Sequence, residues 1–195
     1  MVNRIVMCNQ IRTLFPIHQT IKGEFIFIHT KQSKMMQMTS WTKLSEVSKI
    51  EDESGVYIVR WAVNGEPQKI GRFGGIDSKG ILYIGSAKNL KKRIKRLWSG
   101  IKEQKPIHTA ARSFIFSNNY SIIDPKDIEI TTVVFDKLNE ARTQEWNALK
   151  YYGNRFKELP PLNLIVGRKR FALVRIESSK VGTDINDKLK ILIDF

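Results

Sequence analysis

The chain has 195 residues, enough for one domain with a hydrophobic core and terminal additions, and its 42% hydrophobic and 27% charged content is ordinary for a globular protein. It carries 33 Lys and Arg against 19 Asp and Glu, and a formal net charge of +14 indicates a polyanionic partner, either nucleic acid or an anionic membrane surface. Cys8 is the only cysteine, which excludes an internal disulfide and a cysteine-based zinc site.

Residues 1–40 are interpreted as an appendage to the main domain. They lack the pattern of a signal peptide, and no apolar run in the chain is long enough to span a membrane, so we expect a cytoplasmic protein without a membrane partner. Alternating side chains at 24–30 predict a strand, and the polar, methionine-rich stretch 31–39 predicts a linker. The predicted domains are the appendage (1–40), a core (41–167) and a basic C-terminal extension (168–195) that packs on the core.

The core opens with two apolar strands. Residues 55–61 form a nearly continuous β-branched and aromatic run, which predicts a strand buried on both faces. Asn64-Gly65 predicts a turn, 69–72 a short strand within a glycine-rich stretch, and 81–85 the second apolar strand.

Two helices and a third strand follow. Asn89 is predicted to be the N-cap of an amphipathic helix that ends near Gly100. Residues 128–135 predict a third strand, and 137–152 a second amphipathic helix that ends at Gly153. The segment 159–163 is predicted to be rigid and extended because each of its two prolines restrains the residue before it.

The tail combines a basic cluster at 168–170, a strand candidate at 171–176 and an apolar stretch at 189–195. The order strand, strand, helix, strand, helix predicts a small, mostly antiparallel sheet flanked by helices. This is an α/β sandwich-like core in the α+β class.

Positive charge is concentrated on the first helix and its surroundings. Between Ser86 and Arg112, nine basic residues face a single acidic one, Glu103. This cluster is either a solvated helix face or a surface for backbone phosphates. The candidate DNA-binding residues are Lys88, Lys91, Lys92, Lys95 and Arg96.

Glu145 lies in the middle of the apolar stripe of the second helix, whereas Glu140 points to the opposite side at 100° per residue. A carboxylate on an apolar face is costly unless it is paired or binds a metal. Glu145 is therefore either half of a buried Glu–Arg pair or a metal ligand or catalytic acid.

Three further side chains are candidates for the same site. Arg93 lies on the flank of the first helix, where its fork suits a phosphate but where boundary arginines are also common. Tyr57 and Tyr83 each lie in a short apolar strand. Each could be a core tyrosine, but in an antiparallel hairpin both hydroxyls could face one shallow site.

These residues resemble the motif of the GIY-YIG nuclease superfamily. Gly55-Val56-Tyr57 and Tyr83-Ile84-Gly85 resemble its signature pair, and Arg93 follows the second motif's glycine at the family's spacing of eight residues. Glu145 matches the family's metal-binding glutamate, and Asn163 the asparagine that closes its core. The resemblance covers about Ser54 to Asn163.

The sequence departs from the family at two places. The gap between the two tyrosines is longer than usual, so a glycine-rich insertion lies between them. Leu97 occupies the position at which many members carry a histidine, and His108 is a candidate substitute. Some members use a lysine near the hairpin, for which Lys69 and Lys79 are alternatives.

The resemblance implies a divalent-metal-dependent endonuclease that hydrolyses DNA with one ion, Mg²⁺ or Mn²⁺. In that scheme Glu145 holds the metal, Arg93 stabilises the transition state, Tyr57 orients or deprotonates the attacking water beside Tyr83, and Asn163 braces the site. The alternatives are a non-catalytic nucleic-acid-binding protein on the same core and a protein whose basic helix binds anionic lipid.

Overall fold

The computed structural model describes residues 40–50, 52–163 and 185–194. The chain divides into two compact units, Met1–Ser33 and Lys34–Phe195, and every described residue belongs to the second. The predicted strands at 24–30 and 171–176, the linker at 31–39 and the basic cluster at 168–170 lie outside the described residues.

The described elements alternate between strands and helices along the chain. In order they are β1 (Thr42–Lys43), the 3-10 helix η1 (Leu44–Lys49), β2 (Gly55–Val63), β3 (Glu66–Pro67), β4 (Ile70–Arg72), β5 (Gly75–Asp77), β6 (Ile81–Ala87), α1 (Leu90–Lys102), α2 (Thr109–Phe116), η2 (Asn119–Ser121), η3 (Pro125–Asp127), β7 (Ile128–Val134), α3 (Leu138–Phe156), η4 (Pro161–Asn163) and α4 (Asp187–Asp194).

The main sheet is antiparallel, and β2 lies at its centre. β7 pairs with one side of β2 and β6 with the other, while β1 extends the sheet beyond β7 and β3 folds back on the end of β2. β2 is buried along most of its length, as its continuous apolar run predicts. The predicted α+β class is confirmed.

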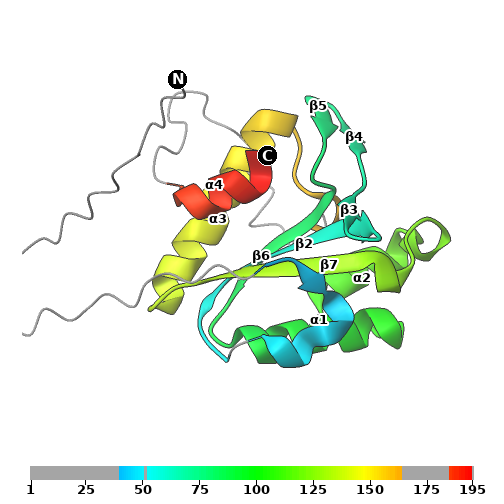
Figure 1. Ribbon diagram of the computed structural model, residues 1–195, viewed down its shortest axis with the longest axis horizontal. Helices are drawn as coiled ribbons and strands as arrows, with labels where there is room; N and C mark the ends of the chain where they lie inside the picture. The colour runs from blue at the N-terminus through cyan, green and yellow to red at the C-terminus, as the bar shows by residue number, and fades with distance from the viewer. Residues whose placement is uncertain (1–39, 51, 164–184, 195) are drawn as a thin grey trace, which may run out of the picture. The chain divides into compact units, whose positions relative to one another are not determined.

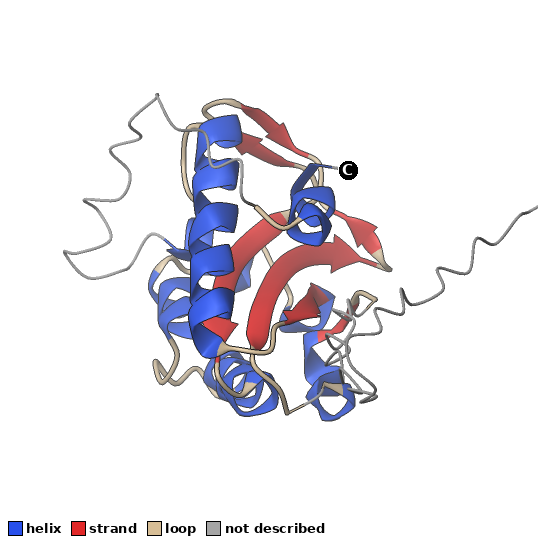
Figure 2. Cartoon of the chain, turned by 90° about the vertical axis from the view of Figure 1, so that its left-hand side faces the viewer, coloured by secondary structure: helices blue, strands red, loops and turns tan. Residues whose placement is uncertain are grey.

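Helices cover both faces of this sheet (Figure 1). Side chains alternate along β2, so Tyr57 and Val59 face the core shared with α1 and α2, whereas Val56 and Ile58 face the core shared with α3 and α4. Figure 2 shows α3 lying across its face of the sheet, with the separate β4–β5 hairpin beside one end of the helix.

Helix α1 begins as predicted, because the Asn89 side chain accepts a hydrogen bond from the backbone N–H of Lys92 at 2.7 Å. Gly100 does not end it. That glycine is buried inside the helix, where an added Cβ would lie 2.7 Å from the Cβ of Ala111, so it lets α1 and α2 approach closely.

The predicted end of the second helix at Gly153 is wrong. Helix α3 continues to Phe156, and Lys157 then adopts the left-handed conformation with φ of 61°. The Phe156 ring packs on Tyr152 with centroids 4.5 Å apart in the buried core. This burial outweighs the cost of about 1 kcal/mol for a glycine inside a helix.

Two further expectations need correction. The segment after α3 is not extended throughout, because Pro161–Asn163 form the short 3-10 helix η4. Helix α2 was not predicted. Within the described part of the chain, none of the helices is both long enough and apolar enough to cross a membrane.

Candidate functional site

The site is built around one edge of strand β6. Among the described strands, β6 pairs only with β2, so no strand meets the backbone groups on its other edge. Asn163 fills part of that edge. Its Nδ2 donates to the carbonyl of Ile84 at 2.8 Å, and its Oδ1 accepts from the N–H of Ile84 at 3.0 Å. The predicted bracing residue thus joins η4 to β6.

Tyr57 and Tyr83 lie together on the α1 and α2 side of the sheet, with ring centroids 5.8 Å apart. The register places Tyr57 opposite Gly85. A Cβ on Gly85 would lie 2.8 Å from the Tyr57 hydroxyl and ring, so only glycine leaves room for the pair.

The tyrosine pair is not a shallow surface site, and that part of the expectation is wrong. Tyr57 is fully buried and Tyr83 is 3% exposed. The inward-facing positions of the two strands lie under α1 and α2, and α2 was missing from the predicted elements.

His108 completes an aromatic cluster with the two tyrosines. It is the N-cap of α2, and its Nδ1 accepts a hydrogen bond from the backbone N–H of Ala110 at 3.1 Å. Nδ1 therefore carries no proton, and the neutral ring holds its proton on Nε2. The Tyr57 hydroxyl oxygen lies 3.0 Å from Nε2 and accepts its proton in a hydrogen bond.

Electrostatics keep both partners neutral. Burial, together with the charges of Arg93 and Arg96, lowers the pKa of His108 from 6.5 to about 3. Burial also raises the pKa of Tyr57 well above 10, and Tyr83 and Glu145 raise it further, while Arg93 opposes the shift. At neutral pH the pair is thus a phenol and a neutral imidazole.

Arg93 connects this cluster to the surface. The residue is half-buried on α1, and its guanidinium interacts with both tyrosine hydroxyls. Its Nε is buried and has no hydrogen-bond partner among the described residues. A buried N–H without an acceptor is costly, and an incoming oxygen would satisfy it.

Glu145 approaches from the opposite face of the sheet. It is 8% exposed on the buried stripe of α3, as its position predicts, whereas Glu140 is exposed. Its Oε2 accepts a hydrogen bond from the Ser86 hydroxyl at 2.6 Å. Ser86 was not predicted to contact the site, although it immediately follows the second tyrosine motif.

A magnesium ion bound at Glu145 would have one carboxylate from the protein as a ligand, with water molecules as most of the others. Among the described residues no three His, Cys, Asp or Glu side chains form a group that could hold a metal. Mg²⁺ is often held by one or two carboxylates and keeps several of its waters, so a single glutamate beside the Ser86 hydroxyl suits that chemistry.

Four of the predicted DNA-binding residues lie on α1, and Lys88 lies just before it. Lys88, Lys92, Lys95 and Arg96 are exposed, and Lys91 is half-buried. Of the two candidate assisting lysines, Lys69 is exposed and Lys79 is half-buried in the inserted segment. No contact ties either lysine to the tyrosine cluster.

No protein-family model, curated protein or solved structure matches the chain. The resemblance to GIY-YIG nucleases therefore stays a prediction that rests on the motif residues of the sequence. His108 was predicted only as a substitute for the histidine that many members of the family carry. The signal that could have placed it is local, because buried Ala110, Ala111 and Phe114 follow it at helical spacing.

Proposed function

We propose that the protein is a divalent-metal-dependent endonuclease that hydrolyses DNA phosphodiester bonds at a GIY-YIG-type site. One observation carries the proposal: side chains selected from the sequence alone converge on the edge strand β6. Tyr57 and Tyr83 lie on one side of it, Glu145 touches Ser86 on the other, and Asn163 holds its backbone. Packing alone does not require this set of polar residues at one place.

Arg93 is the residue that would bind the scissile phosphate. It is half-buried, and its Nε lacks a hydrogen-bond acceptor. Its planar fork matches phosphate oxygens and carries a permanent positive charge. Charge that develops on those oxygens during hydrolysis would be stabilised by a donor already in place.

Tyr57 would act as a protonated hydroxyl rather than as a base. Its raised pKa opposes deprotonation at neutral pH, and the His108 N–H occupies one acceptor position on its oxygen. The hydroxyl proton is then available to orient a water or a phosphate oxygen. His108 is a positioning residue that fixes this orientation.

Glu145 would hold the metal, with Ser86 fixing the carboxylate through its 2.6 Å hydrogen bond. When bound there, the ion would supply charge neutralisation at the leaving oxygen. The basic outer side of α1 would hold the DNA backbone without selecting a base sequence.

The test is nicking of supercoiled plasmid with and without Mg²⁺. Wild type should nick only with the metal, and Glu145→Gln should abolish nicking while leaving DNA affinity nearly intact. Glu140→Ala is the matched control, because Glu140 is an exposed carboxylate of the same helix. Loss of nicking in the Glu140 variant, with nicking retained in Glu145→Gln, would show that the wrong glutamate has been chosen.

One observation favours a second candidate, a non-catalytic nucleic-acid-binding protein on the same core. Tyr57 is fully buried, as expected of a core tyrosine with a satisfied hydroxyl. That protein would bind DNA with a strong salt dependence and never nick it. The plasmid assay, repeated with Mn²⁺, separates the two functions.

A further inference from the structure

The inserted β4–β5 hairpin ends in an exposed apolar tip. Phe73, at the turn, is 92% exposed, and Ile76 on β5 is 65% exposed. On the opposite face of the hairpin, the side chains of Ile70, Arg72 and Asp77 point toward the rest of the protein. Single exposed apolar residues are common, but a phenyl ring at the turn together with an exposed isoleucine on the following strand offers a local apolar surface.

The hairpin is held firmly at its base. Asp77 is fully buried, and its carboxylate accepts hydrogen bonds from the backbone N–H groups of Lys79 and Ile81 and from the Tyr152 hydroxyl, all at 2.8–2.9 Å. Arg72 lies 3.6 Å from the carboxylate of Glu158. These contacts fix both strands of the hairpin to the protein.

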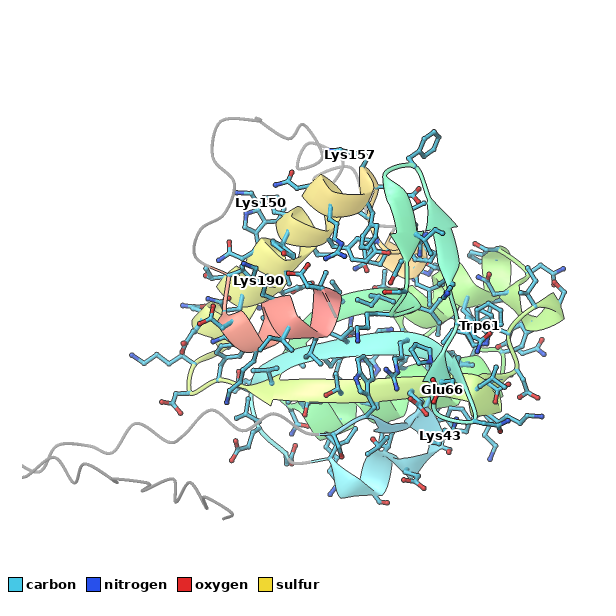
Figure 3. The ribbon with its side chains drawn as sticks, turned by 45° about the horizontal axis from the view of Figure 1, so that its top comes forward. Lys43, Trp61, Glu66, Lys150, Lys157 and Lys190 are labelled. Carbon is cyan, nitrogen blue, oxygen red and sulfur yellow. The ribbon has the colours of Figure 1, made fainter. Side chains whose placement is uncertain are left out.

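The tip is fixed as well. The N–H of Gly74 donates to the carbonyl of Phe156 at 2.8 Å, and a Cβ on Gly74 would lie 2.6 Å from the carbonyl oxygen of Arg155. The turn therefore packs directly on the last residues of α3, and Figure 3 shows Lys157 at that end of the helix beside the hairpin. Phe73 projects from a rigid support.

The surroundings of the tip are basic. Lys69 is exposed and Lys79 is half-buried in the inserted segment, whereas Arg72 faces the protein in an ion pair with Glu158, and the carboxylate of Asp77 is fully buried and already hydrogen-bonded. Lys157 is exposed at the adjacent helix end. An exposed aromatic ring among basic side chains suits single-stranded nucleic acid, whose bases stack on rings while its phosphates meet the charges.

The tip also lies within reach of DNA held at the site. Phe156 follows Glu145 by eleven residues, which is about 16 Å along the α3 axis. That length corresponds to about five base pairs of B-DNA. A strand that passes Glu145 along α3 would reach the hairpin within half a helical turn.

We propose that Phe73 stacks on an unpaired or unstacked base of the DNA, about five nucleotides from the cleaved bond. This inference rests on the proposed function for the DNA partner, but it concerns a surface that the catalytic residues do not use. Stacking on a base contributes about 5- to 150-fold in affinity by alanine substitution. The contact would make the enzyme prefer substrates with an accessible base.

The test is fluorescence anisotropy in EDTA, where no metal-dependent cleavage occurs, with a labelled 20-nucleotide single strand and its duplex. Phe73→Ala should weaken single-strand binding about 5- to 150-fold without changing the salt slope, since no charge is removed. Phe73→Trp should bind like wild type. Phe116→Ala is the matched control, because Phe116 is 69% exposed on α2, and it should bind within about two-fold of wild type.

Phe73→Ala binding within two-fold of wild type on both DNAs would overturn the inference. So would a wild-type dimer that Phe73→Ala converts to a monomer in sedimentation, since the tip would then contact a second copy of the chain. Plasmid nicking by wild type tests the proposed function separately. If wild type nicks plasmid and Phe73→Ala binds DNA like wild type, only the stacking contact is refuted. If Phe73→Ala binds DNA more weakly and wild type does not nick plasmid, only the nuclease function is refuted.

Discussion

The neutral state of His108 predicts a specific loss of stability in acid. The folded protein holds the pKa of this imidazole at about 3, whereas the unfolded chain returns it to about 6.5. Below pH 6.5 the imidazole of the unfolded chain binds a proton, whereas that of the folded protein stays neutral. The stability contributed by the low pKa is therefore fully present above 6.5 and is lost as the pH falls toward 3.

The size of the loss follows from the shift. Three and a half pH units at 1.36 kcal/mol each amount to about 5 kcal/mol by pH 3, and the part lost between pH 7 and pH 5 is about 2 kcal/mol. His108→Asn removes the titration but keeps an N-cap, because an asparagine oxygen can accept from the N–H of Ala110. Contributions that are common to both proteins cancel in the difference.

The measurement is urea unfolding of both proteins at pH 7, 6, 5.5 and 5. Wild type should lose about 2 kcal/mol more than His108→Asn across this range. His108→Ala, which lacks the cap, should be about 1 kcal/mol less stable than His108→Asn at every pH. Parallel pH profiles for wild type and His108→Asn would refute the argument, because the imidazole would then titrate freely in the folded state.

Three other substitutions test the site from different sides. Tyr57→Phe leaves the His108 N–H without its acceptor, so it should cost about 1–3 kcal/mol of stability in urea unfolding. If the hydroxyl serves the reaction, the same change should slow single-turnover cleavage by about 10²–10⁴-fold. Cleavage within a few-fold of wild type would assign Tyr57 to the core. Replacing Lys92 and Lys95 by Gln should make the slope of log K for DNA binding against log salt concentration shallower by about 1.8 for any DNA sequence. An unchanged slope would show that α1 does not contact the DNA backbone. Asn163→Leu leaves the N–H and carbonyl of Ile84 unpaired and should destabilise by at least about 2 kcal/mol. Asn163→Asp keeps the acceptor but places a buried carboxylate oxygen against the carbonyl of Ile84, so it should be at least as destabilising. Equal melting of wild type and both variants would contradict the bracing role.

The elements that could be predicted are those with strong local signals. The β2 run is apolar at all but one of its nonglycine positions, and Asn89 caps α1 through its own side chain three residues from its partner, so both follow from short stretches of sequence. Glu145 was found because helical geometry alone places it on the apolar stripe. Asn64-Gly65 likewise form the expected turn, with φ of 53° and 85°.

Features that depend on distant partners could not be predicted. Helix α3 passes Gly153 because Phe156 packs on Tyr152 and accepts the Gly74 N–H, a contact formed only after the insertion folds back. Arg60 of β2 pairs with Glu129 of β7 at 2.8 Å, although 69 residues separate them. The enclosure of Tyr57 likewise required α2.

The residues of the motif perform two different tasks. Gly85 and Asn163 shape the edge of β6, the glycine by leaving room for a ring and the asparagine by replacing a strand, and packing explains both completely.

Arg93 and Glu145 have no such explanation. The Nε of Arg93 is buried without an acceptor among the described residues, and Glu145 is a carboxylate at 8% exposure that the Ser86 hydroxyl holds; apolar side chains at the same positions would avoid the cost of removing these polar groups from water. Under the proposed function both groups would be kept beside one strand edge for a ligand, because Arg93 would bind the oxygens of a phosphodiester and Glu145 would bind its divalent ion.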